Sequence, residues 1–126
     1  MSFWYLATPY SKFPGGIEAA FREACRQTGL LIKAGIPVFS PIAHTHPVAI
    51  VSGLDPLDHS ISIPADKPLM EAAKGLIICE LEGWETSKGI GEEFDFFLES
   101  NKQIVHMTPG DVPGVLAEIK SIEKTP

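Results

Sequence analysis

The stretch from Gly83 to Asp95 contains the residues with the clearest capacity for chemistry. Two adjacent carboxylates, Glu92 and Glu93, follow a glycine-rich loop. The pattern predicts that a helix begins near Lys88 or Gly89, which would put both carboxylates in its first turn. Unpaired backbone N–H groups and the positive end of the helix dipole favour the ionised form of a carboxylate there. An ionised carboxylate in such a place can act as a nucleophile.

The neighbouring residues predict how this stretch is positioned. Leu76–Cys79 is a short apolar run that predicts a buried strand leading into the loop. Gly89 and Gly91 would let a bulky group approach the backbone, and Ser87 supplies a hydroxyl beside it. The simpler alternative is a capped helix with two surface glutamates. The apolar positions that would pack this helix on a sheet are Ile90, Phe94, Phe97 and Leu98.

The amino-terminal residues predict a second place where a ligand could bind. Phe3–Ala7 is an aromatic and apolar run that predicts a central strand, and Thr8–Gly16 predicts the loop that leads from it into a helix. Ligands of open α/β sheets bind at the carboxyl ends of the strands, where this loop begins. Ser11, Lys12 and the glycine amides of the loop could bind a phosphate.

Alternating strands and helices predict an α/β domain. Further strands are expected at Ile36–Pro41 and Ile104–Met107, and the helix Ile17–Ala34 implies a right-handed parallel crossover. We expect residues 1–126 to form a single doubly wound domain of flavodoxin-like or Rossmann-like form, with four or five parallel strands. A fifth strand would have to come from Val48–Val51, which could equally be helical. The remaining expected elements are a short helix at Lys67–Lys74, a turn at Thr108–Gly114 and a last helix at Val115–Ile122.

The long connection Pro41–Pro68 is rich in proline and histidine, so it is expected to be a lid or a binding loop. Its polar residues could assemble a metal site, although no cysteine and no helical pair of histidines supports one. They could equally hold the loop in place. The residues concerned are His44, His46, Asp55, Asp58 and His59.

Composition and charge limit the possible partners. A net charge of −6 and a pI near 5.1 argue against a nucleic-acid polymer or an anionic membrane as partner, because both require basic patches. A small nucleotide is compatible, since one phosphate needs only a loop and a helix end. The sequence predicts neither a signal peptide nor a membrane span, so a cytoplasmic location is expected. Cys25 and Cys79 are interpreted as core residues rather than as a disulfide or a metal pair.

Three motifs together resemble those of a known group of enzymes. Gly-Trp-Glu-x-Ser-x-Gly-x-x-x-Glu occupies Gly83–Glu93, Tyr-Leu-Ala-x-Pro occupies Tyr5–Pro9, and Ser-Pro-Ile-x-His-x-His-Pro occupies Ser40–Pro47. The chain resembles the nucleoside 2-deoxyribosyltransferase-like superfamily over nearly its whole length, and looks most like its small DUF1937-type branch. The resemblance implies cleavage or transfer at the N-glycosidic bond of a 2′-deoxynucleoside or its 5′-monophosphate.

The resemblance also implies roles for single residues. Glu93 would attack the anomeric carbon, Asp66 would assist the leaving base, and Tyr5 would lie against the sugar or the nucleophile. Glu92 would face solvent or support the site from behind. The ordinary alternatives are that Asp66 is the N-cap of the short helix and that Tyr5 is a core residue. The further substrate-binding residues implied are Thr8, Pro9, Ser11, His44, His46, Trp84, Ser87, Gly89 and Gly91.

The resemblance implies no cofactor and a metal-free pocket, and a small-molecule nucleoside or nucleotide is the expected partner. A homo-oligomer, a dimer or larger, is expected for the same reason.

Three features depart from the pattern of catalytic relatives. Thr8 and Asp95 stand where those relatives usually have glycine, and the loop Tyr10–Gly16 lacks the arginines that nucleotide-specific relatives use on a 5′-phosphate. Asp95 and the arginine-poor loop keep open a second class of function, a non-catalytic module that binds a nucleotide or a nucleotide derivative. A phosphohydrolase is a more distant alternative, because it would need a bound divalent metal.

Overall fold

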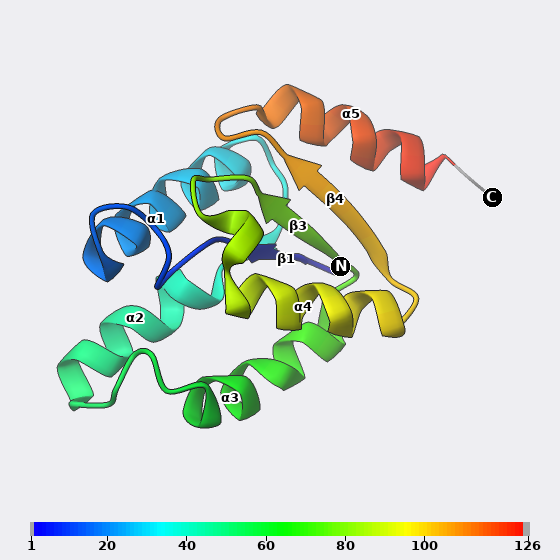
Figure 1. Ribbon diagram of the computed structural model, residues 1–126. Helices are drawn as coiled ribbons and strands as arrows, with labels where there is room; N and C mark the ends of the chain where they lie inside the picture. The colour runs from blue at the N-terminus through cyan, green and yellow to red at the C-terminus, as the bar shows by residue number, and fades with distance from the viewer. Residues whose placement is uncertain (1, 125–126) are drawn as a thin grey trace.

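The computed structural model describes residues 2–124, which form a four-stranded parallel sheet with helices packed on its two faces (Figure 1). The strands are β1 (Trp4–Ala7), β2 (Val38–Phe39), β3 (Gly75–Cys79) and β4 (Gln103–Met107), in the order β2-β1-β3-β4. The helices are α1 (Ile17–Lys33), α2 (Pro41–Ser52), α3 (His59–Ala72), α4 (Lys88–Glu99) and α5 (Val112–Glu123), with a 3-10 turn η1 (Trp84–Thr86) before α4. The predicted doubly wound α/β fold is confirmed, although β2 is shorter than Ile36–Pro41.

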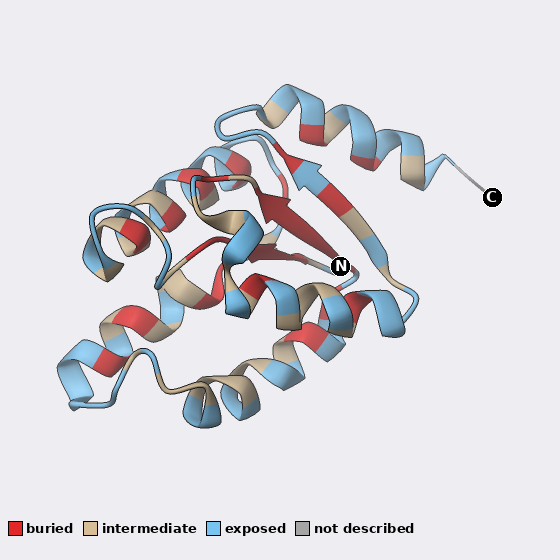
Figure 2. Cartoon of the chain, in the orientation of Figure 1, coloured by how far each residue is buried: buried red, intermediate tan, exposed pale blue. Residues whose placement is uncertain are grey.

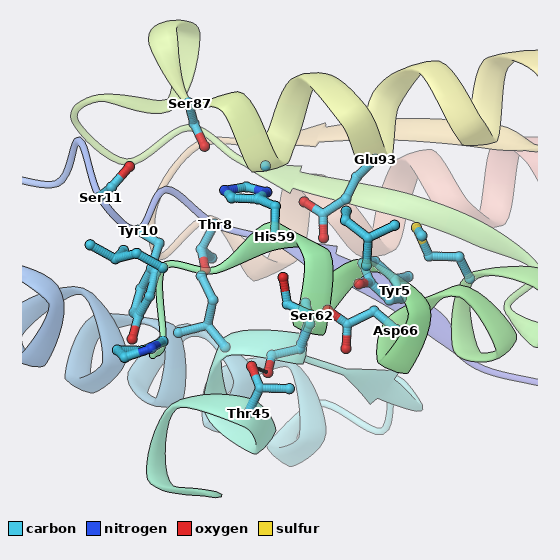
Figure 3. Close-up of a pocket in the computed structure, with 17 residues that line it drawn as sticks. Tyr5, Thr8, Tyr10, Ser11, Thr45, His59, Ser62, Asp66, Ser87 and Glu93 are labelled. Carbon is cyan, nitrogen blue, oxygen red and sulfur yellow. Dashed lines mark hydrogen bonds between the residues drawn. The ribbon is translucent and has the colours of Figure 1, made fainter. Parts of the chain in front are cut away.

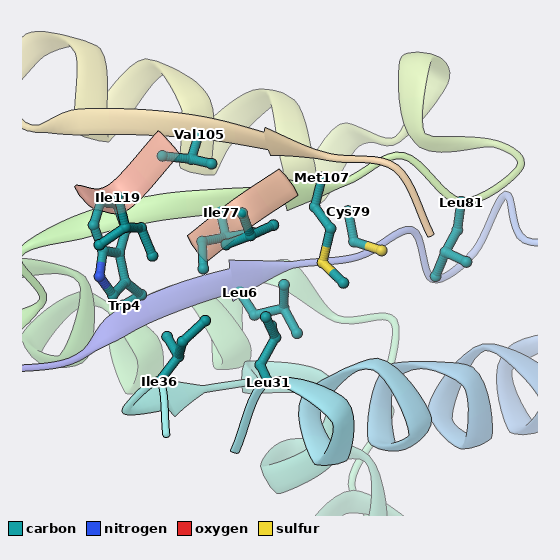
Figure 4. Close-up of a cluster of buried hydrophobic side chains, with 11 residues drawn as sticks. Trp4, Leu6, Leu31, Ile36, Ile77, Cys79, Leu81, Val105, Met107 and Ile119 are labelled. Carbon is teal, nitrogen blue, oxygen red and sulfur yellow. The ribbon is translucent and has the colours of Figure 1, made fainter. Parts of the chain in front are cut away.

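Alternation along the central strands builds one hydrophobic core on each face of the sheet. Leu6 of β1 and Ile77 of β3 pack with residues of α1 and α5, in the core that Figure 4 shows. Tyr5 and Ile78, their neighbours in sequence, pack with residues of α3 and α4 on the opposite face. Successive side chains of a strand point to opposite faces, so both faces of β1 and β3 are buried, as the red strands of Figure 2 show. This is why these strands read as continuous apolar runs.

α1 carries one buried stripe, and Cys25 lies outside it. Cys25 follows Ala24 by one residue, which turns its side chain about 100° around the helix, and it is exposed. The prediction that Cys25 is a core residue is therefore wrong, whereas Cys79 is buried in β3, as predicted. The helix ends at Lys33, and Gly35, with φ of 84°, follows as a left-handed residue that stops it. The buried positions of α1 are Ala20, Ala24, Gln27 and Leu31.

The segment Pro41–Pro68 forms mostly helical structure, so the prediction that it is a loop is wrong. The Ser40 hydroxyl caps α2 by accepting a hydrogen bond from a backbone N–H at 3.2 Å, and Pro41 occupies the first turn, where its missing N–H costs nothing. Gly53, with φ of 76°, ends this helix. Of the prolines that indicated a loop, four begin or interrupt helices and Pro56 lies in the connection between α2 and α3. Val48–Val51 is helical rather than a fifth strand.

α3 begins much earlier than predicted. The Asp58 carboxylate caps it by accepting from the backbone N–H of Ser60 at 3.0 Å, so the helix does not start at Lys67. Asp66 consequently lies in the middle of α3 and is not an N-cap. At the other end, the Lys102 ammonium group donates hydrogen bonds of 2.6 to 2.9 Å to three backbone carbonyls that end the helix. Those carbonyls belong to Met70, Glu71 and Ala73.

The carboxyl-terminal half follows the predicted order of elements. α4 begins at Lys88, as expected, and buries Ile90 and Phe97. Leu98 is 58% exposed, so its predicted place in the buried stripe is wrong. α5 begins within the predicted turn, because Asp111 caps it by accepting from a backbone N–H at 3.1 Å. Within residues 2–124, no helix is both long and apolar enough to span a bilayer.

Candidate active site

A cavity lies beside the carboxyl end of β1, on the face of the sheet that carries α2, α3 and α4 (Figure 3). Its wall combines residues from β1 and the following loop with residues from these three helices. No lysine or arginine is among the residues that line it. The polar side chains on the wall are Tyr5, Thr8, Tyr10, Ser11, Thr45, His59, Ser62, Asp66, Ser87 and Glu93.

A close backbone approach brings the first loop against the loop that precedes α4. Gly83 has φ of 94°, and a Cβ atom built on it would lie 2.5 Å from the backbone oxygen of Lys12. Only glycine fits such a position without displacing the backbone of the first loop. The contact places Ser11 and Ser87, which lie near these two residues in the chain, on the same cavity wall.

α4 presents Glu93 to the cavity. The Ser87 hydroxyl caps this helix by accepting from the backbone N–H of Ile90 at 3.3 Å, so Lys88 is its first residue. Glu92 and Glu93 therefore lie in the second turn, beyond the strongest influence of the helix dipole. The prediction that they occupy the first turn is wrong, because the helix begins one turn before the carboxylate pair.

Burial, rather than the helix dipole, sets the ionisation of Glu93. Burial raises the pKa of the Glu93 carboxyl to about 8. The Tyr5 hydroxyl opposes this rise, because it favours the ionised carboxylate as a donor, and the negative charges of Asp66 and Glu92 add to the rise. The site therefore holds its candidate nucleophile mainly in the protonated form at neutral pH.

Tyr5 lies at the floor of the cavity and is fully buried. Its ring packs between Phe39 and Phe97, with centroids 6.0 and 5.7 Å away. Burial and the negative charge of Glu93 raise the pKa of the phenol, so Tyr5 remains a neutral donor. Its hydroxyl makes no hydrogen bond of ordinary geometry within residues 2–124. Tyr5 is therefore both a core residue and a residue of the cavity wall, although the sequence left these positions as alternatives.

Asp66 reaches the cavity from α3, with a half-buried side chain. Burial raises the pKa of its carboxyl to about 6, partly offset by His44. Two carboxyl groups that share one cavity resist simultaneous ionisation, because each negative charge disfavours the other. With pKa values of about 6 and about 8, Asp66 is mainly a carboxylate and Glu93 mainly a carboxylic acid at neutral pH. Transfer of one proton from Glu93 to Asp66 gives the opposite arrangement, and this minor form is the one that acid-assisted displacement at a sugar by Glu93 requires.

The unsatisfied polar atoms of the protein gather at this cavity. Five buried side-chain polar atoms within residues 2–124 lack a hydrogen-bond partner of ordinary geometry. Four belong to residues on the cavity wall, and the fifth belongs to Glu92 beside it. His59 Nδ1 and Glu92 Oε2 face each other at 3.4 Å, whereas the other three atoms face the cavity without such a neighbour. Buried polar groups are normally paired, so these three mark a place where a ligand can complete the hydrogen bonding. The five atoms are Tyr5 Oη, Thr8 Oγ1, His59 Nδ1, Asp66 Oδ1 and Glu92 Oε2.

The structure brings together seven of the residues predicted from the sequence. The cavity wall contains Tyr5, Thr8, Ser11, Asp66, Ser87, Gly89 and Glu93. The other predicted residues, which do not line it, are Pro9, His44, His46, Trp84 and Gly91.

His46 connects two helices instead of facing the cavity. Its ring is 3% exposed and stacks on Phe21 with a centroid distance of 4.6 Å. Nε2 donates a hydrogen bond of 2.9 Å to the Glu18 carboxylate, and in the neutral ring Nδ1 accepts one from the Tyr10 hydroxyl. His46 therefore holds its segment in place, which is the alternative to substrate binding that the sequence left open. His44 is exposed and packs its ring against Phe39.

Trp84 and Gly91 line a second cavity, on the far side of the loop that leads into α4. This cavity shares Ser87 with the first one and also contains Asp95 and His106. The Trp84 and His106 rings meet edge to face at 5.8 Å. Asp95 therefore lies outside the cavity that holds Glu93. Pro9 is fully buried below the first loop.

Sequence reasoning missed the contribution of α3 beyond Asp66. Four of the side chains that line the cavity from this helix are His59, Ser62, Asp66 and Met70. Their spacing of three and four residues is that of one helix face, and this periodicity was present in the sequence. The prolines concealed it, because they indicated a loop. Within residues 2–124, no group of three or more His, Cys, Asp or Glu is arranged to hold a metal ion.

The fold and the site define an α/β protein whose candidate active site combines two carboxyl groups and a tyrosine. The chain belongs to the family described as "Domain of unknown function (DUF1937)", whose model matches residues 2–109. The predicted membership of the DUF1937 family is confirmed. All residues placed on the cavity wall lie within the matched range. No curated protein matches the chain.

The raised pKa values predict that stability falls as the pH rises. The folded protein binds the protons of Glu93 and Asp66 more tightly than the unfolded chain, in which the carboxyl pKa values are near 4.5 and 3.8. This contribution is complete below those values and is lost as the pH rises to about 6 for Asp66 and about 8 for Glu93. One such group can change the free energy of unfolding by at most about 1.4 kcal/mol per pH unit.

Urea unfolding at a series of pH values will measure this effect. We expect Glu93→Gln, which keeps the shape and cannot ionise, to flatten the curve between about pH 6 and 8 and to exceed the wild type in stability above it. Glu99→Gln, which removes an exposed carboxyl from the same helix, is the matched control. Parallel curves for wild type and Glu93→Gln across this range would show that Glu93 is not held protonated.

Proposed function

We propose that this protein cleaves or transfers the N-glycosidic bond of a 2′-deoxynucleoside or its 5′-monophosphate through a glutamyl-glycosyl intermediate. The observation that carries the proposal is the meeting of Glu93, Asp66 and Tyr5 in one cavity that is lined by unpartnered polar atoms. The resemblance of the motifs to the nucleoside 2-deoxyribosyltransferase-like superfamily names the same three residues, and it supplies the reaction class.

In the first step, a Glu93 carboxylate oxygen attacks C1′ while the bond from C1′ to the base nitrogen breaks. The bonding electrons leave with the base, and Asp66 in its acid form donates a proton to the base. The Tyr5 hydroxyl, which favours the ionised form of Glu93, stabilises the attacking carboxylate. Ionised Glu93 and protonated Asp66 are each the minority form at neutral pH, so the fraction of the pair in this arrangement limits the rate without preventing the reaction.

The preference for a deoxyribose has a chemical reason. The transition state has oxocarbenium character, and a 2′-hydroxyl withdraws electrons from the forming cation. Its absence lowers the barrier and leaves room beside the nucleophile. Water or a second base then attacks C1′ and releases Glu93.

A non-catalytic nucleotide-binding module is the alternative. Two departures from the catalytic members of the superfamily favour it, but neither changes the residues of the cavity that holds Glu93. Asp95 lines the second cavity rather than the one that holds Glu93. The lack of arginine in the first loop affects the recognition of a phosphate, and it does not alter the pair of Glu93 and Asp66. Burying two carboxyl groups in one cavity is costly for a protein that needs only to bind, so we favour catalysis.

We also propose a homo-oligomer in the cytoplasm, as expected from the sequence. Apolar side chains are exposed along α2, the connection after it and the start of α3, next to the cavity that Leu57 lines. A second copy could cover them, because contiguous apolar surface commonly marks an interface. Sedimentation velocity will show whether the chain self-associates. The residues are Val48, Ile50, Val51, Leu54, Leu57 and Ile61.

Removal of the nucleophile tests the reaction directly. We expect Glu93→Ala to lose base release by several orders of magnitude while it remains folded, because the covalent step has no substitute. Release of free base from a panel of 2′-deoxynucleosides will be measured by chromatography. Mass spectrometry of wild type quenched with a slowly hydrolysed 2′-fluoro nucleoside should find the sugar on the peptide that contains Glu93.

Glu99→Ala is the control for this experiment, since it removes an exposed glutamate of the same helix. Its rate should equal that of the wild type. An active wild type together with a Glu93→Ala variant of similar rate would refute the assignment of the nucleophile. A wild type that retains a nucleotide but releases no base would favour the binding module.

The charge of the cavity wall predicts a preference for nucleosides over monophosphates. Two carboxyl groups and no lysine or arginine line the cavity, so a phosphate dianion would enter a region of negative charge. We expect kcat/KM for a 2′-deoxynucleoside to exceed that for its 5′-monophosphate by at least about tenfold. Ser11→Arg, which adds a cation to the first loop, should narrow the ratio. Equal kcat/KM values of the wild type for the nucleoside and the monophosphate would show that the charge of the cavity wall does not select between them.

A further inference from the structure

His59, on the cavity wall, forms a pair with Glu92 beside the cavity, and the proposed reaction has not used this pair. His59 is the first residue of α3 and lines the cavity, whereas Glu92 lies on α4, next to Glu93. His59 Nδ1 and Glu92 Oε2 are 3.4 Å apart, and both atoms are buried without another partner. A carboxylate beside Nδ1 favours a proton on that nitrogen, which leaves the lone pair of Nε2 available as a base.

The pair contributes little to folding. Each of the two side chains is 37% exposed. Ion pairs at such positions contribute little to stability, because solvent screens them and ordering two side chains costs entropy. The position of the pair is better explained by chemistry, because His59 lines the same cavity as Glu93.

His59 and Asp66 occupy different parts of the cavity. Asp66 follows His59 by seven positions on α3, which corresponds to about two turns and about 10 Å along the helix axis. Figure 3 shows the His59 ring on one side of the Glu93 carboxyl, with Tyr5 and Asp66 on the other. The two α3 side chains can therefore serve different reacting groups. A nucleobase accepts a proton at atoms distant from C1′, so the group that assists the base need not be the group that activates water.

We propose that His59 is a catalytic residue that activates water for hydrolysis of the glycosyl-Glu93 intermediate, with Glu92 as its positioning residue. This inference rests on the proposed function. It deepens that function by making water the main acceptor, so that the protein is a hydrolase rather than a base-exchange transferase.

The step conserves atoms and electrons. A water oxygen attacks C1′ of the intermediate while His59 Nε2 takes one of its protons. The bond between C1′ and the Glu93 oxygen breaks, and its electron pair returns to the carboxylate. The products are 2-deoxyribose and free Glu93, and imidazolium then releases the proton to solvent. The sum of both steps is deoxynucleoside plus water giving base plus 2-deoxyribose.

Rapid-quench kinetics of the full chain with a 2′-deoxynucleoside will test the proposal. In His59→Gln we expect the first step to persist, with a burst of about one base per site, while steady-state turnover falls about a hundredfold. Glu92→Gln should lose less turnover, on the order of tenfold. Sodium azide should restore turnover in both variants and yield deoxyribosyl azide, because an anionic nucleophile needs no base. His106→Gln is the matched control, since it removes a histidine that pairs with a carboxylate, Glu80, at 3.7 Å outside the cavity.

The outcomes separate this inference from the proposed function. A burst in the wild type, with His59→Gln at wild-type turnover, would refute the role of His59 and leave the function standing. Loss of the burst in folded His59→Gln, or failure of azide to restore either variant, would also refute it. Absence of base release from the wild type would refute both. Circular dichroism will verify folding, and Glu92→Gln decides the matter if His59→Gln does not fold.

Discussion

Burying the carboxyl group of Glu93 is the constraint on which the site depends. The sheet face could cover that helix position with an apolar side chain, as it covers Ile90 and Phe97 on the same helix. It instead holds a carboxyl whose pKa burial raises to about 8, beside a second carboxyl and an unpaired phenol. Each of these groups is costly to bury, and their coincidence in one cavity concentrates the cost at one place. Such a concentration is characteristic of active sites.

α3 is the element that makes this burial possible, and it is weakly attached. Met70 is its only fully buried residue, and two prolines interrupt its hydrogen bonding. The helix covers Glu93 without a large apolar contribution of its own. Segments with few buried contacts open at low free-energy cost, which suits a wall that must admit a ligand.

The sequence predicted the sheet well because of how the sheet is buried. β1 and β3 have helices on both faces, so their runs were apolar without interruption. The start of α4 was also predictable, because Ser87 is a good capping residue ahead of an apolar stripe. The candidate trio of Tyr5, Asp66 and Glu93 came from motif resemblance, which carries spatial information that no local pattern contains.

The failures have equally physical causes. Prolines disfavour helix interiors on average, yet packing against α1 and α4 keeps α2 and α3 helical around Pro47, Pro64 and Pro68. The raised pKa of Glu93 could not be foreseen, since the helix dipole is a local effect whereas burial depends on what the rest of the chain places above the residue. The same limit hid the pairing of His59 with Glu92, two residues that belong to different helices.

The three hydrogen bonds from Lys102 have a mechanical consequence for this wall. They fix the carboxyl end of α3 to the start of β4, whereas its amino end is joined to α4 by one partly exposed ion pair. A helix fixed at one end pivots there, so displacement grows with distance from the fixed end. His59 would travel furthest and Asp66 much less, so an opening of α3 would displace the proposed water-activating group more than the group proposed to assist the leaving base.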